Sequence, residues 1–98
     1  MNLEKQIEAY NKTALKYTEE NLIFTIPGVE FSPEEVQHIA SIVTSILMTR
    51  DGVGYPGGDV VKAIVEDNLT DEILEEDQLC KQVLRFLVQA KQWCAVSY

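Results

Sequence analysis

The sequence predicts an all-α fold: a small helical bundle of three long helices and one short helix, with an extended connector after the first helix. Apolar residues recur every three or four positions over most of the chain, which is the period of an amphipathic helix. Residues suited to helix ends flank these stretches. The length of 98 residues fits one domain, residues 1–98, with a thin core. Association into a homo-oligomer would supplement such a core.

The first predicted helix covers about residues 3–20. Its apolar stripe recurs at spacings of four and three and consists of Leu3, Ile7, Tyr10, Ala14 and Tyr17. The next segment, NLIFTIPGVEF, breaks this pattern with β-branched and aromatic residues before a Pro27-Gly28 turn signal. A strand at residues 22–26 would have no partner in this sequence, so an extended apolar connector is the preferred interpretation, with the strand left open.

The second predicted helix has the clearest boundaries in the chain. Ser32 is a good N-cap, Pro33 suits the first helical position, and Glu35 completes a capping box. Asp51-Gly52 is expected to end this helix, with Arg50 placed favourably for the helix dipole.

Two further helices follow a Gly57-Gly58 turn. A short, apolar helix is expected from Asp59, because an apolar run begins directly after it. Thr70 or Asp71 then begins a last, long helix that continues to about Trp93, with acidic residues at its start and basic residues later.

Composition and charge exclude several classes of protein. The net charge of −8 argues against a direct nucleic-acid binder and against an anionic-membrane binder, since both need a basic face. The N-terminus lacks an apolar signal core, and the stretch HIASIVTSILM is too short to span a bilayer. Cys80 and Cys94 fall in one predicted helix, roughly 21 Å apart along its axis, so they cannot pair. A reducing cytoplasm fits these features.

The sequence offers no catalytic or metal-binding signature. His38 is the one histidine, with no Cys, Ser or Asp at a telling offset, so a surface or half-buried role on a helix is favoured over a catalytic base. No His pair or Cys-x-x-Cys supports zinc, and no calcium loop is present. We therefore expect a protein that is not an enzyme, with no catalytic residue, no metal and no cofactor.

The stretch RDGVGYPGGDVVKAIVEDNL contains the predicted ligand site. Two glycines before a helix free backbone N–H groups at the positive end of its dipole, an arrangement that suits phosphate. Nearby charges and rings complete the predicted ligand-binding set: Arg50, Tyr55, Gly57, Gly58, Lys62 and, as a stacking surface, Trp93. Asp59 opposes this interpretation, because its carboxylate would cap the same groups and repel an anion. A corner between helices without a ligand therefore stays open.

Two other features leave alternatives open. The run Glu66–Asp77 holds seven carboxylates and no basic residue, which indicates either a solvated helix start or a docking face for a basic partner. The residues of that predicted docking face are Glu66, Asp71, Glu72, Glu75 and Glu76. The apolar tail Trp93, Val96 and Tyr98 either folds back onto the bundle or meets another subunit.

The segment YPGGDVVKAIVEDNLTDEILEEDQLCKQVLRFL resembles a group of small accessory proteins found in tailed-phage genomes. The matching places are a Gly-Gly turn, a short apolar helix, an Asn-Asp-Leu-like motif, an acidic residue about eight positions on, and a closing Cys/Trp segment. They fall here at Gly57-Gly58, Val60 to Val65, Asp67-Asn68-Leu69, Asp77 and Trp93-Cys94. The Asn and Asp are exchanged relative to that pattern, as are the Cys and Trp.

This resemblance implies a phage or prophage protein made in the cytoplasm of a bacterial host. Small proteins of this kind often counter host defence by sequestering a nucleotide signal or by occluding a host protein. We expect a non-catalytic accessory protein that sequesters a phosphate-bearing small molecule such as a nucleotide immune signal. The alternatives are an acidic inhibitor that occludes a host defence protein through the face at residues 66–76, and an assembly factor with no ligand.

Overall fold

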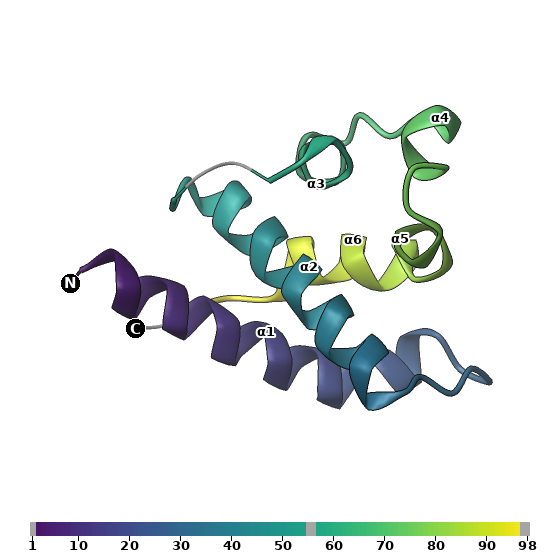
Figure 1. Cartoon of the computed structure of the whole chain (residues 1–98), viewed down its shortest axis with the longest axis horizontal. Coiled ribbons are helices and arrows are strands. Elements are labelled where there is room, and N and C mark those ends of the chain that lie inside the picture. The colour runs from purple at the N-terminus through teal and green to yellow at the C-terminus, as the bar shows by residue number, and fades with distance from the viewer. Residues whose placement is uncertain (1, 55–56, 97–98) are drawn as a thin grey trace.

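The computed structural model describes residues 2–54 and 57–96, which form six helices and no strand. Figure 1 shows their order along the chain. The helices are α1 (Leu3–Thr25), α2 (Pro33–Asp51), α3 (Asp59–Glu66), α4 (Asp71–Leu74), α5 (Gln78–Gln82) and α6 (Leu84–Trp93). The predicted all-α class is confirmed for these residues. None of the described helices has the length and apolarity needed to span a lipid bilayer.

α2 matches the sequence prediction at both ends. The Ser32 hydroxyl accepts from the amide of Glu35 at 3.1 Å, and the Ser32 amide donates to the Glu35 carboxylate at 3.0 Å, so the capping box is complete. Gly52 ends the helix in the left-handed region with φ of 72°, a conformation that glycine adopts without a steric penalty.

α1 is longer than predicted, and the prediction of an extended segment at residues 22–26 is wrong. The helix continues to Thr25, and the connector is confined to residues 26–32. Leu22 is buried on this last turn, and the Thr25 hydroxyl donates to Oε1 of Gln89 on α6 at 2.8 Å. Packing against α6 thus overrides the β propensity of this stretch.

The last predicted helix is divided into three, which corrects the prediction of three long helices and one short helix. Asp77 has an extended backbone (φ −142°, ψ 104°), and its carboxylate accepts from the amides of Leu79 and Cys80. Aspartate favours such a cap over a helix interior, because its short side chain competes for backbone amides. Val83 (φ −108°, ψ 20°) then separates α5 from α6.

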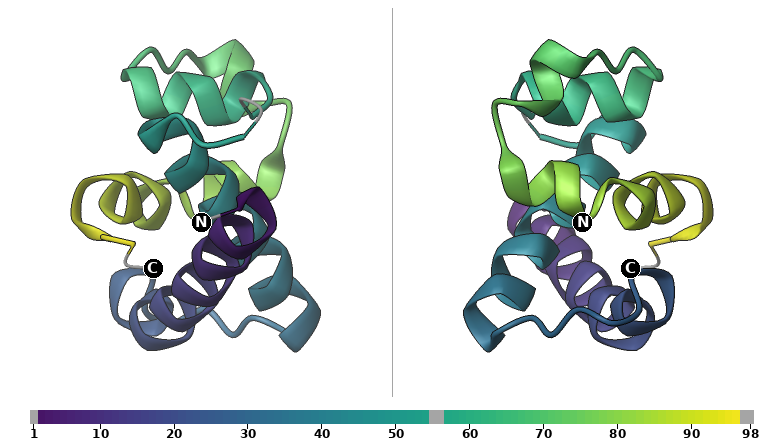
Figure 2. Two further views of the ribbon diagram at one scale, coloured as in Figure 1. Left: turned by 90° about the vertical axis from the view of Figure 1, so that its left-hand side faces the viewer. Right: turned by 90° about the vertical axis from the view of Figure 1, so that its right-hand side faces the viewer.

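The core surrounds α2, which packs against α1 on one side and α3 on the other, while α6 contacts all three (Figures 1 and 2). The largest fully buried side chains include Tyr10, Phe86, Ile39, Ile46, Leu47, Ile64 and Leu87. Cys80 on α5 and Cys94 after α6 are both buried and free. Because α5 and α6 are separate, the prediction that these cysteines share one helix is wrong, while their unpaired state is confirmed.

Candidate functional site

The residues predicted to bind a ligand lie in two places. Gly57, Gly58 and Lys62 lie at the start of α3, whereas Arg50 bonds the carbonyl group of Cys94, the residue that follows Trp93 at the end of α6. Tyr55 lies outside the described residues, as does Tyr98 of the apolar tail. The described residues of the set therefore do not form one site within a single chain.

The Gly57-Gly58 turn has a structural role at its first residue. The Gly57 amide donates to the hydroxyl of Thr49 at 2.9 Å, and a Cβ added at Gly57 would lie 2.5 Å from Cγ1 of Val61. Gly58 is the N-cap of α3 with φ of −68°, and no side chain caps that end of the helix. The expected cap by Asp59 is therefore wrong, and the turn serves at least as a corner where α3 approaches closely. Its contact with a ligand stays a prediction.

The charges beside Lys62 do not favour an anion. A hollow of about 220 Å³ beside this residue is also lined by Asp59 and Glu66. Two carboxylates against one ammonium group give this part of α3 a negative potential. A phosphate would be held here only if another molecule added positive charge.

Arg50, in the last turn of α2, forms hydrogen bonds with carbonyl groups at the end of α6. Its Nη1 donates to the carbonyl oxygens of Lys91 at 2.9 Å and Cys94 at 2.6 Å. Its Nε and Nη2 donate to the Asp51 carboxylate at 2.7 and 3.0 Å. The helix has unpaired carbonyl groups at this end, and a guanidinium group satisfies them well. These bonds occupy Arg50, so it positions the segment around Trp93.

A second hydrogen bond ties this cluster to α1. The Tyr10 hydroxyl, which is almost fully buried, donates to Oδ2 of Asp51 at 2.7 Å. The hydrogen bond from Arg50 lowers the pKa of Asp51 most strongly; burial opposes this shift and the Tyr10 hydrogen bond adds to it. The same hydrogen bond to Asp51 raises the pKa of Arg50. The cluster Tyr10–Asp51–Arg50 thus links α1, α2 and α6 through charged and hydroxyl groups.

Trp93 is exposed over 74% of its surface, although most of its neighbours on α6 pack into the core. It lines a groove of about 330 Å³ between α1 and the segment after α6, together with Lys16, Tyr17 and Glu20. The Tyr17 ring packs at 5.6 Å, centre to centre, against Phe86, and burial raises its pKa. The groove thus combines an indole, a phenol and an ammonium group.

Lys16 is the cation of this groove. Its Nζ lies 4.0 Å from Oε1 of Glu20, and both side chains are mostly exposed, so this ion pair is weak. The sequence indicated Trp93 but not Lys16 or Tyr17, because these residues lie more than seventy positions earlier on another helix. The adjacent basic and aromatic residues Lys16-Tyr17 in α1 were the signal that could have found them.

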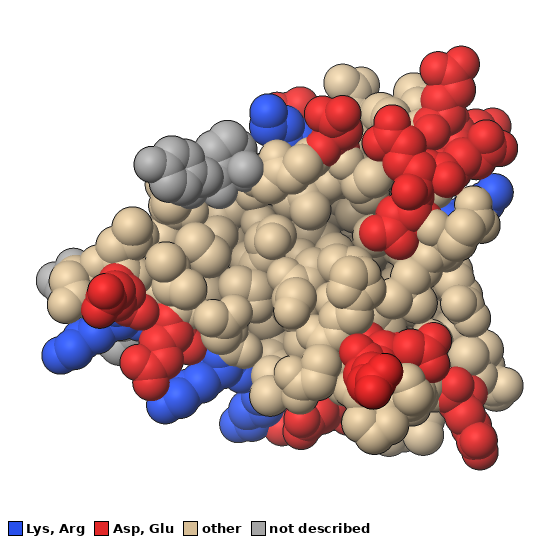
Figure 3. Space-filling view, in the orientation of Figure 1, with Lys and Arg blue, Asp and Glu red and all other residues tan. Residues whose placement is uncertain are grey.

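The predicted docking face lies over α3, α4 and the turn after α4, where carboxylates gather in the upper right of Figure 3. Its members Glu66, Asp71, Glu72, Glu75 and Glu76 are exposed. Among the described salt bridges, none includes these five residues. Two neighbouring acids have structural partners: Asp67 pairs with Lys91 at 3.2 Å, and Asp77 caps α5. The structure therefore exposes the five predicted carboxylates, and none of them forms a described salt bridge.

In the described part of the chain, no three His, Cys, Asp or Glu side chains come together in a way that could hold a metal ion. His38 is exposed on α2.

Comparison with protein-family models, with curated proteins and with solved structures finds no match for this chain. The groove beside Trp93 and the acidic face are thus the candidate binding sites among the described residues.

Proposed function

We propose that this chain is a non-catalytic binding protein that sequesters a phosphate-bearing small molecule of the nucleotide type. The exposed Trp93 at the edge of a groove supports the proposal most directly, because its indole offers a flat apolar face on which a base can stack. The likeness of residues 50–94 to tailed-phage accessory proteins supports a counter-defence role in the bacterial cytoplasm, with a nucleotide immune signal as the ligand.

In this proposal the nucleobase stacks on Trp93 and the phosphate contacts Lys16. Stacking of a base on an aromatic side chain contributes about 1–3 kcal/mol and tolerates different bases. The groove of about 330 Å³ is at the lower end of the range for small-molecule sites, ~300–1,000 Å³. A second subunit would enlarge it, so we include a homo-oligomer in the proposal. The turn at Gly58 and Lys62 of that second subunit would contact the ligand, whereas the Gly57 amide is already bonded to Thr49.

Fluorescence titration tests this function directly, because Trp93 is the single tryptophan of the chain. Cyclic dinucleotides, ADP-ribose and mononucleotides are added to the protein at low salt, and calorimetry measures the affinity of any that quench the emission. The expected result is quenching by at least one of them, with affinity reduced about tenfold or more by Trp93→Ser. The matched control is Phe24→Ser, which removes another exposed aromatic residue outside the groove.

Lys16→Glu supplies the second arm of this experiment. It should weaken binding of the phosphate-bearing compound, whereas Lys5→Glu, at the start of α1, should leave it unchanged. If none of the compounds changes the emission or releases heat, the sequestration function is refuted. If both lysine variants weaken binding equally, the attraction comes from net charge and Lys16 has no particular role.

The acidic face favours a second function, occlusion of a basic host protein. Five exposed carboxylates without described cationic partners form one surface, and such a surface accelerates and orients the approach of a basic groove. Glu72→Lys with Glu75→Lys should abolish capture of a partner from a bacterial host lysate. The control, Glu4→Lys with Glu8→Lys, changes net charge equally on α1 and should retain capture. Equal capture by both variants would show that the face is ordinary solvated surface.

A further inference from the structure

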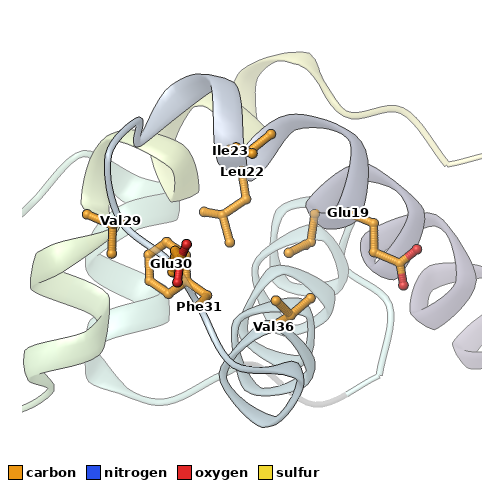
Figure 4. A pocket seen from close by; sticks show the side chains of 8 residues that line it. Glu19, Leu22, Ile23, Val29, Glu30, Phe31 and Val36 are labelled. Atoms are coloured by element: carbon orange, nitrogen blue, oxygen red, sulfur yellow. The ribbon is translucent and has the colours of Figure 1, made fainter.

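A second groove lies between the last turns of α1, the connector and the first turn of α2 (Figure 4). Its volume is about 430 Å³, and its lining is mainly apolar. Leu22 points into the middle of the groove, between Phe31 of the connector and Val36 of α2 (Figure 4). Ile23 is exposed over 64% of its surface at the groove's edge. The groove is therefore a ready surface for apolar side chains.

The hydroxyl group of Thr18, which lines the groove, already has a hydrogen-bond partner within the chain. Thr18 is fully buried below it, and its hydroxyl donates to the carbonyl of Ala14 at 2.7 Å. An apolar side chain that enters would therefore displace water without leaving this hydroxyl group unsatisfied. This property favours an apolar anchor over a polar ligand.

The described charges at the groove are all negative. Glu19 lies on the α1 side and Glu30 on the connector side, and both side chains are exposed (Figure 4). The lining residues that the structure describes include no lysine or arginine, and no described salt bridge neutralises either glutamate. The groove thus offers an apolar floor between two free carboxylates.

We propose that this groove docks an amphipathic segment of a partner protein, with apolar side chains entering between Leu22, Phe31 and Val36 and lysine or arginine residues pairing with Glu19 and Glu30. An amphipathic helix that enters a hydrophobic groove presents anchors at positions i, i+3 or i+4, and i+7. Charge complementarity selects a basic partner. A second copy docked through the same groove would instead bring its own Glu19 and Glu30 near those of the first. The docking surface uses residues separate from the groove beside Trp93, so it goes beyond the proposed function.

The test uses a defined probe, an 18-residue helical peptide made of leucine and lysine with its leucines on one face. Its binding to the intact chain is measured by calorimetry and by amide chemical shifts. Three control peptides accompany it: one of the same composition with leucines spread around the helix, one with glutamate in place of lysine, and one with glutamine. The expected result is preference for the leucine–lysine helix, with shift changes concentrated at residues 18–36.

Two double variants with the same change in net charge then test whether Glu19 and Glu30 supply the attraction. Glu19→Lys with Glu30→Lys should weaken the leucine–lysine helix about tenfold, a value that two reversed surface ion pairs can supply. It should also strengthen binding of the leucine–glutamate helix. Glu4→Lys with Glu8→Lys should change the affinity less than threefold.

Some outcomes would overturn the docking surface. If both double variants weaken the probe equally, or if the spread-leucine peptide binds as well, the attraction is general and the groove has no role. Equal binding of the glutamine helix would remove the basic partner chemistry. Sedimentation equilibrium tests whether a second copy of this chain occupies the groove instead. If the wild-type protein is an oligomer and Ile23→Ser converts it to a monomer, a second copy occupies the groove. None of these results depends on nucleotide binding at Trp93, so the two proposals fail separately.

Discussion

Replacing Arg50 by lysine tests whether this guanidinium group holds the end of α6. Lysine keeps the positive charge beside Asp51 but cannot reproduce bonds to two carbonyl groups and both carboxylate oxygens at once. Hydrogen bonds that involve a charged group contribute roughly 1.5–3 kcal/mol each, and the Arg50 side chain is 24% exposed. Loss of one carbonyl bond should therefore favour local opening of the segment around Cys94 by about 2 kcal/mol.

The thiol of Cys94 reports that opening. Cys94 is 5% exposed, so a thiol reagent reaches it only when the segment after α6 opens, and its labelling rate follows the population of the open state. An opening that is about 2 kcal/mol more favourable accelerates labelling roughly thirtyfold. Mass spectrometry of digested peptides separates Cys94 from Cys80, which is buried on α5 and should react at an unchanged rate.

Arg85→Lys is the matched control, because Arg85 is exposed and lies on α6, the helix whose end Arg50 bonds. It should leave both labelling rates unchanged. If Arg50→Lys changes the Cys94 rate by less than twofold, the two carbonyl bonds do not hold the segment and the positioning role of Arg50 is refuted. Acceleration of both cysteines together would instead indicate global destabilisation.

The other predictions concern the turn before α3, acid stability and thiol chemistry. Gly57→Ala should reduce the free energy of unfolding by about 1–3 kcal/mol, because the added Cβ clashes with Val61. Gly58 has a negative φ and open space around it, so Gly58→Ala should change the free energy of unfolding by less than about 0.5 kcal/mol. Similar urea midpoints for the two variants would contradict this prediction. The lowered pKa of Asp51 contributes stability above its ordinary value of 3.8, and that stability is lost as pH falls through the lower, folded-state pKa. Asp51→Asn should flatten this acid limb in urea titrations. Burial, with Asp77 nearby, raises the pKa of Cys80 to about 12. The buried neutral thiol therefore contributes its full share of the folding stability below pH 9.0, and that contribution declines as pH rises toward 12. Alkylation of Cys80 at pH 8 should therefore be slow in the folded protein and complete in denaturant, and fast labelling without denaturant would contradict its burial.

The sequence predicted most reliably those helix ends that local residues determine. Ser32 and Glu35 define the start of α2 without help from the rest of the chain, and Gly52 defines its end. The end of α1 depends on contacts with α6, such as the bond between Thr25 and Gln89, and no local pattern contains that information. The division after α4 was accessible in principle, because Asp77 is a strong cap within a predicted helix.

The candidate sites followed the same rule. The acidic face could be predicted because its carboxylates are neighbours in sequence, and the structure keeps them exposed. Arg50 was predicted to contact a ligand, and its bonds to the carbonyl groups of Lys91 and Cys94 were invisible in a local reading. The groove beside Trp93 and the groove between Glu19 and Glu30 each bring together separate segments of the chain, so only tertiary structure shows them.

The contacts of Arg50 also bear on how the protein forms during synthesis. The carbonyl groups that it binds lie 41 and 44 residues further along the chain, and translation produces them later. Until then the guanidinium group has only Asp51 and water as partners. A ribosome-bound chain that ends before Lys91 therefore lacks this tie between its middle helix and its last one, and stalled fragments of that length should be more sensitive to cellular proteases.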